Sequence, residues 1–417
     1  MEVCLLHPPH YNSSDDRLDP PMGLLYLATH IRDAGHDVVV CDLSGKTEEE
    51  WDIPVADVYG LTVYVSSLSD SRKIANKCRT INPKAKIVVG GAHPSACPDD
   101  HDFADHVVIG YGEQVIVDLI NGKALDSVRN ITSVPVDSLF KFPAYDLIDI
   151  NSYHRKIHDK HYFPYLTSRG CPFSCSFCGL AAMHKINGGV KMADGNLVVE
   201  HLTRIKNEFG IDRIAFQDDI FTLKGKRLDI ILKGIKDLGM RFRCMGRAGY
   251  DTEYTYQQLS EAGCDQVSWG IESGSQHILD SMRKNVKVQD NHNVIQWAKK
   301  YNINSRSFFI IGFPGETRDT IEETKQFIIN SDPDQYFISN FIPYPGTDVW
   351  NNPRAYGIID IIKDYSQFYQ VSKDGTGGIT IDTKWLSKSE LKELESEFRS
   401  WLRINKPFRG ERQLYER

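Results

Sequence analysis

Three cysteines lie close together in the middle of the chain, at Cys171, Cys175 and Cys178. The spacing C-x3-C-x2-C places three thiolates on one short loop, with an aromatic residue before the last cysteine. A four-iron cubane held by only three thiolates keeps one iron without a protein ligand, and a chelating small molecule can bind there. The alternative is a structural zinc site completed by His184. Zinc sites, however, usually combine C-x2-C with a second, distant pair of ligands, so the spacing favours the iron–sulfur interpretation.

The remaining cysteines are scattered. Cys4 and Cys41 fall within predicted strands, where a buried cysteine behaves as a small hydrophobic residue. A second cluster built from these two with Cys78 and Cys97 is the less favoured alternative. The last cysteine is Cys264, and the nine positions do not resemble the disulfide framework of a small secreted protein.

The cysteine loop follows the first of six predicted strands, which alternate with predicted helices. This rhythm predicts a (β/α)6 partial barrel, in which the residues that do chemistry lie at the carboxyl ends of the strands. The predicted strands are 165–168, 213–217, 242–245, 266–270, 306–312 and 336–342.

The stretch from Thr167 to Cys178 resembles the signature of the radical S-adenosylmethionine (SAM) superfamily, including Phe177 at its aromatic position. The resemblance extends over residues 160–347. Later segments resemble motifs of the methylthiotransferase and cobalamin-dependent branches. These segments are IAFQDDIF at 214–221, GIESG at 270–274, IGFPGET at 311–317 and PYPGT at 343–347.

The resemblance implies a [4Fe–4S] cluster on the three cysteines, with SAM as its chelating ligand. It places the backbone of Phe177 near the adenine of SAM. Asp218, Arg247 and Glu272 are candidates to bind the amino, carboxylate and ribose groups of SAM. Taken singly, each has a structural explanation, since Asp218 can cap a helix and Arg247 can form a surface ion pair. Their joint occurrence at successive strand ends favours binding.

The first 120 residues alternate short apolar strands with amphipathic helices, which predicts a parallel, doubly wound sheet. Two segments, HPP at 7–9 and DPPMGLLYLA at 19–28, resemble the start of the cobalamin-binding domain of class B radical SAM enzymes. The flavodoxin-like fold of that domain is therefore expected here.

Small residues follow the strands of this predicted domain. Ser66 and Leu68 match the S-x-L element of cobalamin domains, and Gly90 and Gly91 match their paired glycines. Such residues let the nucleotide tail of cobalamin pass close to the backbone. Gly112 belongs to a Gly-x-Gly-Glu segment that resembles the same domain, and we interpret it as a turn beside the cofactor.

The Asp-x-His-x-x-Gly element, which provides a histidine to cobalt in methionine synthase, is absent, and Pro21 falls near its position. His10 and Tyr64 lie on predicted loops that can approach the lower face of the corrin. The alternative, no protein ligand to cobalt, stays open. A cobalt without a strong lower donor favours methyl transfer.

The predicted fold class is α/β. A flavodoxin-like (Rossmann-type) cobalamin-binding domain spans 1–125, a linker spans 126–160, and a radical SAM core, a partial TIM barrel, spans 161–347. A small helical C-terminal extension spans 348–417. Its final helix begins at a capping box formed by Ser387 and Glu390.

Composition limits the partners. The net charge is −7, from 49 basic and 56 acidic side chains, so no nucleic-acid partner is expected. No run of about eighteen apolar residues suggests a membrane span. The start of the chain lacks a basic leader followed by an apolar run, so a cytoplasmic location is expected.

The resemblance implies a methyltransferase that transfers the methyl group of methylcobalamin to an unactivated carbon, with an external electron donor of the flavodoxin or ferredoxin type. The substrate is unknown; the small extension favours a polypeptide, and a small metabolite, a lipid or an antibiotic precursor stays open. Three different functions stay open as well: non-methylating chemistry such as cyclisation, methylthiotransfer, and a non-enzymatic corrinoid-binding or zinc-stabilised module.

Overall fold

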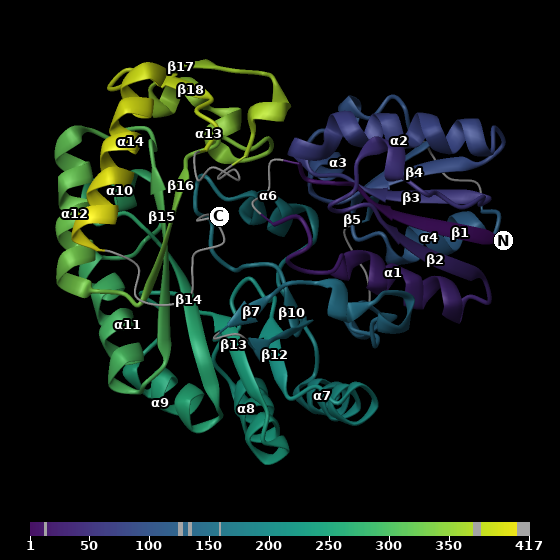
Figure 1. Cartoon of the computed structure of the whole chain (residues 1–417), viewed down its shortest axis with the longest axis horizontal. Coiled ribbons are helices and arrows are strands. Elements are labelled where there is room, and N and C mark those ends of the chain that lie inside the picture. Colours follow the sequence, from purple (N-terminus) through teal and green to yellow (C-terminus); the bar gives the residue numbers. More distant parts are fainter. Residues whose placement is uncertain (12–14, 124–127, 132–135, 158–159, 370–376, 407–417) are drawn as a thin grey trace.

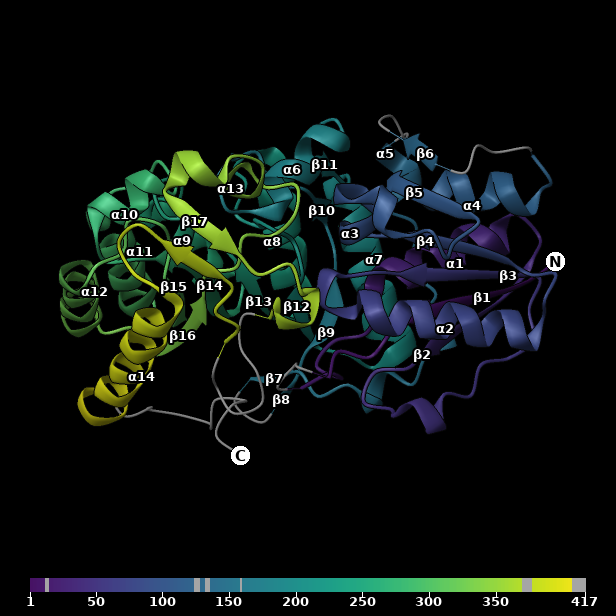
Figure 2. The ribbon, with the colours of Figure 1, turned by 90° about the horizontal axis from the view of Figure 1, so that it is seen from above.

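The structure is a computed structural model that describes the chain except residues 12–14, 124–127, 132–135, 158–159, 370–376 and 407–417. Two α/β domains lie side by side, each built around a six-stranded sheet (Figures 1 and 2). Among the described helices, none has the length and hydrophobicity required to cross a membrane.

The N-terminal sheet is parallel throughout, with strand order β2-β1-β3-β4-β5-β6. This confirms the flavodoxin-like prediction, whose order is 2-1-3-4-5 with a topological switch between β1 and β3. The sheet continues past residue 125 into the expected linker, because β6 lies there. The elements are β1 (Glu2–His7), α1 (Met22–Asp33), β2 (Asp37–Asp42), β3 (Val58–Thr62), α2 (Leu68–Ile81), β4 (Lys86–Gly90), α3 (Ala92–Ala96), β5 (His106–Gly110), α4 (Glu113–Ile120) and β6 (Val128–Ile131).

Alternate residues of β1 belong to different cores. Val3 and Leu5 pack in the cluster that contains Leu24 of α1, whereas Cys4 and Leu6 pack in the cluster that contains Ile74 of α2. Both faces of the sheet are therefore covered by helices, which explains why its strands are nearly continuous apolar runs.

The second domain is the predicted (β/α)6 partial barrel. Its strands pair in parallel in the order β16-β15-β14-β13-β12-β9. The strands are β9 (Phe163–Tyr165), β12 (Arg213–Phe216), β13 (Arg241–Met245), β14 (Cys264–Glu272), β15 (Asn304–Ile311) and β16 (Gln335–Asn340); the helices are α7 (Gly195–Phe209), α8 (Lys226–Leu238), α9 (Glu253–Glu261), α10 (Gln276–Ser281), α11 (Val288–Lys300) and α12 (Arg318–Ser331).

Both edges of this open barrel are covered. Arg399 donates to the carbonyl oxygen of Ile338 on β16 at 3.1 Å, from the final helix α14 (Lys388–Asn405). At the opposite edge the hydroxyl of Tyr145 donates to the carbonyl oxygen of Pro164 on β9 at 2.7 Å. Covering these edges satisfies backbone groups that the incomplete barrel leaves unpaired.

The C-terminal extension is only partly helical. Ser387 and Glu390 form the predicted capping box of α14, and a short antiparallel strand pair that was not predicted precedes this helix. The elements are α13 (Asp348–Asn351), β17 (Ile358–Ile361) and β18 (Ile381–Thr383). Short elements also connect the domains and surround the cysteine loop: α5 (Val136–Leu139), β7 (Lys156–Ile157), β8 (Lys160–His161), β10 (Ser168–Arg169), α6 (Gly179–Ile186) and β11 (Lys191–Met192).

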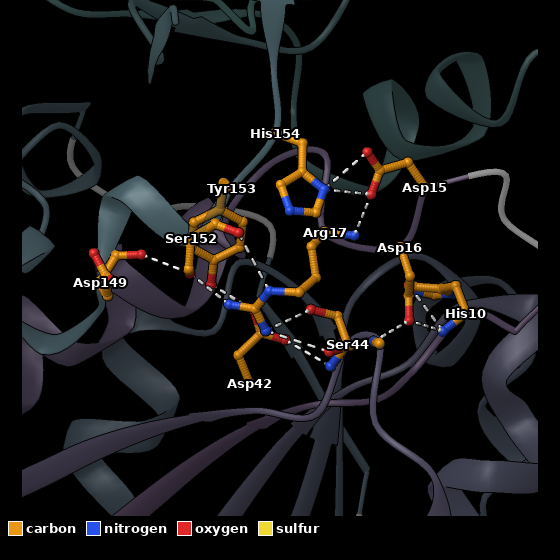
Figure 3. A network of polar contacts seen from close by, with 11 residues as sticks. His10, Asp15, Asp16, Arg17, Asp42, Ser44, Asp149, Ser152, Tyr153 and His154 are labelled. Carbon is orange, nitrogen blue, oxygen red and sulfur yellow. Dashed lines mark hydrogen bonds and ion pairs between the residues drawn. The ribbon is translucent and has the colours of Figure 1, made fainter. Parts of the chain in front are cut away.

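A polar network fastens the connecting segment to the N-terminal domain (Figure 3). The Arg17 guanidinium donates to the Ser152 hydroxyl at 2.6 Å and to the Ser44 carbonyl oxygen at 3.3 Å, and lies 4.9 Å from the centre of the Tyr153 ring. The next residues continue this contact, because the Arg155 amide donates to the carbonyl oxygen of Leu18 at 3.1 Å. The connection between the domains is therefore anchored by side chains as well as by the chain itself.

Candidate active site

One large cavity, of about 1980 Å³, lies between the carboxyl ends of the barrel strands and those of the N-terminal sheet. Both domains contribute to its wall, as does a segment of the C-terminal extension. The three cysteines of the motif, Cys171, Cys175 and Cys178, all line it. His184, which would complete a zinc site, is not among the described residues that line it.

Backbone hydrogen bonds connect the cysteine loop to two segments that lie later in the chain. The amide of Ser176 donates to the carbonyl oxygen of Met282 at 3.0 Å, and the Val349 amide donates to the Ser176 carbonyl oxygen at 3.2 Å. Burial raises the pKa of the Cys178 thiol to about 12 and also raises the pKa of Cys171. A bound metal would favour the thiolate form of these cysteines, because a metal ligand must be deprotonated.

Arg247 lies directly against this loop. Its Nη1 is 3.7 Å from the Sγ of Cys175, its Nη2 donates to the Lys284 carbonyl oxygen at 2.6 Å, and its guanidinium stacks 3.7 Å from the centre of the Phe173 ring. Arg247 is buried and lines the cavity, so the alternative of a surface ion pair is wrong. A fixed cation at this place suits a carboxylate ligand.

Glu272 and Lys284 form a buried ion pair in the cavity wall, with 2.8 Å between Oε1 and Nζ. Glu272 ends β14 in the left-handed region, with φ +66°. Gly270 makes room for it, since a Cβ on that glycine would lie 2.1 Å from the Glu272 carboxylate. A glutamate held in this strained conformation is typical of a binding site.

The two carboxylates of the 218–219 pair have different surroundings. Asp218 is fully enclosed and accepts hydrogen bonds from the Thr167 amide at 2.7 Å and from the Ser168 hydroxyl at 2.5 Å. Asp219 lines the cavity, accepts from the Gly170 amide at 2.9 Å, and has a pKa that burial raises to about 6. The structure thus brings Asp219 to the cavity, while Asp218 holds the strand that enters the cysteine loop.

On the N-terminal side, His10, Tyr64, Ser66 and Leu68 all line the same cavity. The His10 and Tyr64 rings are in edge contact, with centroids 4.9 Å apart, and His7 packs against both. The element that carries Ser66 is a short 3-10 helix, Val65–Ser67, that begins α2.

The three predicted glycines are not among the described residues that line the cavity. Gly91 has φ +107°, and a Cβ there would lie 3.0 Å from the Thr62 hydroxyl oxygen, so it shapes the turn after β4. Gly90 ends β4, and Gly112 precedes α4 against Leu27. Their position beside a cofactor tail stays a prediction.

Comparison with known proteins agrees with this geometry. Residues 165–328 match the radical SAM superfamily, and residues 19–120 match the B12 binding domain. An uncharacterized methyltransferase, PH0819, from Pyrococcus horikoshii is 30% identical over 89% of this chain and 90% of its own length. The chain belongs to the cobalamin-dependent radical SAM methyltransferase family.

Two further similarities support the architecture. The radical SAM methyltransferase TsrM from Kitasatospora setae, solved with cobalamin and a [4Fe–4S] cluster, superposes with a TM-score of 0.68 at 18% identity, over 94% of this chain and 84% of that one. The anaerobic magnesium-protoporphyrin IX monomethyl ester cyclase of Rubrivivax gelatinosus is 24% identical over 84% of this chain and 69% of its own length. The cofactors of this radical SAM methyltransferase are accordingly a [4Fe–4S] cluster, SAM and cobalamin.

The residues present fit these groups. Three cysteines face one cavity for the cluster, and Phe177, Arg247 and Glu272 line the same wall, where SAM would bind. His10 and Tyr64 line the part of the cavity that the N-terminal domain contributes, where a corrin would bind.

Sequence reasoning missed several lining residues of this methyltransferase. They include His7, Asp219, Lys284 and a segment of the extension, Lys363–Tyr369. Asp219 follows the strand that the family motif marks, so a signal existed for it. The extension segment carries no motif; it lies near the N-terminal domain, with the Tyr365 ring 5.1 Å from that of His93.

Proposed function

We propose that this methyltransferase transfers a methyl group to an unactivated carbon of its substrate. The supporting observation is that the cysteine loop and the cobalamin-domain loops that carry His10 and Tyr64 line a single cavity. When bound there, the cluster and SAM supply a carbon-centred radical and methylcobalamin supplies the methyl group. A shared cavity would allow one substrate carbon to approach both groups, as interception of a short-lived intermediate requires.

The protein's own residues bind and orient these groups. Arg247 offers a fixed guanidinium to a carboxylate beside Cys175, and Glu272, held by Lys284, offers an oriented acceptor on the same wall. Apolar side chains from α6 and from the barrel strands also line the cavity, among them Met183, Phe308 and Phe337.

The test uses protein purified anaerobically and reconstituted with iron, sulfide and cobalamin. Incubation with methyl-deuterated SAM, a reductant and candidate acceptors is followed by mass spectrometry. We expect 5′-deoxyadenosine, S-adenosylhomocysteine and a product that carries the deuterated methyl group. The Cys175→Ala variant is expected to lose bound iron and all three products, whereas Cys97→Ser is expected to keep them.

Two results would contradict the proposed function. Zinc in place of iron at the three cysteines excludes the radical chemistry, and a product without the deuterated methyl group excludes methyl transfer. The second outcome would favour ring formation, the chemistry named for the Rubrivivax gelatinosus relative. Loss of iron in Cys97→Ser would favour a second cluster of the methylthiotransferase kind.

A polypeptide side chain is the first acceptor class to test, as the sequence predicts. The small extension that favours this class also reaches the cavity, because its segment Lys363–Tyr369 lies along it. An electron donor of the flavodoxin or ferredoxin type and a cytoplasmic location belong to the same proposal.

A further inference from the structure

Arg243 is a buried cation in the cavity wall that the cofactors do not explain. It lies on β13, is 5% exposed and lines the cavity. Within the described part of the chain, its Nε and Nη1 atoms have no hydrogen-bond partner. A guanidinium buried in this way is costly unless an anion or strong acceptors accompany it.

The charged groups around Arg243 increase the cost of burying its positive charge. Arg155 and Arg306 are its cationic neighbours, and Asp19 is the carboxylate that opposes them. That carboxylate is already engaged, because it pairs with Arg155 and accepts from Gln217 at 3.2 Å. Burial, together with the two neighbouring guanidiniums, lowers the pKa of Arg243.

Arg243 and Arg247 occupy different positions along the cavity. Arg247, which contacts Cys175, follows four residues later along the same strand and its exit. At about 3.3 Å per residue, the two guanidiniums belong to backbone positions up to about 13 Å apart. The part of the cavity at Arg247 and Cys175 is called the cluster end below, and the part at Arg243 is called the inner end.

The surface beside Arg243 is aromatic. Phe308 and Phe337 line the cavity with ring centroids 5.7 Å apart, and the Arg306 guanidinium lies 4.4 Å from the centre of the Phe337 ring. A ligand at this end would contact both aromatic side chains and guanidinium groups.

We infer that the inner end of the cavity binds an oxyanion, a carboxylate or a phosphate, and that Arg243 is the residue that holds it. Planar guanidinium groups bind such anions through two parallel hydrogen bonds. The assignment of this anion to the methyl acceptor rests on the proposed function. The acceptor is then an acid with an apolar part next to its charged group, and its reacting carbon lies toward the cysteine loop.

The test measures anion binding without turnover, so it stands apart from any failure of methyl transfer. The full-length reconstituted protein is treated with phenylglyoxal in the presence of inorganic phosphate or acetate, and modification of Arg243 is followed by peptide mass spectrometry. Isothermal titration with the same two anions gives affinities. We expect one of them to protect Arg243, and the better of the two identifies the phosphate or carboxylate class.

Variants of Arg243 show whether the bound anion belongs to the substrate or to one of the cofactors, SAM and cobalamin. Arg243→Gln is expected to weaken binding of the probe anion about tenfold or more, and to leave the affinities for SAM and cobalamin within about twofold of wild type. Arg241→Gln is the matched control, because Arg241 is on the same strand but exposed and paired with Asp265. It is expected to change no anion affinity.

Three results would overturn the inference: no protection by either anion, equal affinity in Arg243→Gln, or a loss of SAM or cobalamin affinity in that variant. The last would assign the site to the SAM carboxylate or to the cobalamin phosphate. If Arg243→Gln does not fold, Arg243→Lys keeps the charge and removes the paired geometry, and the same weakening is then expected of it.

Discussion

Glu113 and Arg169 form a buried ion pair, 2.5 Å between Oε1 and Nη1, that joins the cobalamin domain to the cysteine loop. Glu113 is the last residue of the Gly-x-Gly-Glu segment, and Arg169 stands two residues before Cys171. The guanidinium also stacks on the ring of Tyr26 at 4.6 Å and donates to the Leu139 carbonyl oxygen at 2.8 Å. The Gly-x-Gly-Glu segment of one domain thus contacts the cysteine motif of the other through this ion pair.

Breaking this pair is expected to destabilise the protein. Glu113→Gln leaves a guanidinium buried without its counter-charge, which costs about 3 kcal/mol of unfolding free energy. Chemical denaturation followed by circular dichroism measures it. The control is Glu397→Gln, which breaks the exposed pair with Arg318 and is expected to cost less than about 1 kcal/mol. Equal losses in the two variants would contradict the assigned role.

Replacing Arg247 is expected to weaken SAM binding while the cluster stays in place. Arg247→Lys loses the fixed, stacked geometry over Phe173, and we expect a fall in SAM affinity of about tenfold to a hundredfold. Equilibrium dialysis with reconstituted protein measures the affinity, and iron analysis shows whether the cluster is retained. Arg283→Lys, at an exposed arginine, is the control. An unchanged SAM affinity in Arg247→Lys would exclude the contact.

The stability of the protein is expected to depend on pH through Glu316. This carboxyl is buried, accepts from the Gly312 amide at 3.1 Å and from the Thr320 hydroxyl at 2.8 Å, and burial raises its pKa to about 7. An unfolded glutamate has a pKa of about 4.3. Between these values the folded chain keeps a proton that the unfolded chain has released, so the free energy of unfolding falls as pH rises.

The contribution of Glu316 is complete below about pH 4 and lost above about pH 7, and amounts to about 4 kcal/mol at most. Glu316→Gln keeps a neutral side chain at every pH. The difference in unfolding free energy between variant and wild type, measured from about pH 4.5 to about pH 7.5, is therefore expected to shift in favour of the variant as pH rises. A difference that does not change with pH would show that the carboxyl titrates normally.

Gly91→Ala is expected to impair the cobalamin domain specifically. Alanine at φ +107° is strained, and its Cβ would press on Thr62, so we expect a loss of about 1–2 kcal/mol and a lower cobalamin content after reconstitution. Gly210→Ala also has a positive φ, but no atom of the described residues lies within 4 Å of its Cβ, and it belongs to the barrel. Its cobalamin content is expected to equal that of wild type; a parallel loss would point to a general effect on stability.

Much of the architecture was predictable because its signals are local. The alternation of apolar strands and amphipathic helices predicted both parallel sheets. The hairpin of the extension was missed, since its two short strands, β17 and β18, are far apart in the chain and neither alternates clearly.

By itself, the sequence identified the candidate cluster ligands, because Cys171, Cys175 and Cys178 are neighbours on one short loop and their spacing alone brings their thiols together. Only the tertiary structure decided which of the adjacent Asp218 and Asp219 faces the cavity, since a change of one residue turns a side chain to the opposite side of the strand exit. It also decided that Glu113 pairs with Arg169, whereas Arg243 has no carboxylate bonded to it among the described residues. Such pairings depend on the packing of segments far apart in the chain, and no spacing along the sequence encodes them.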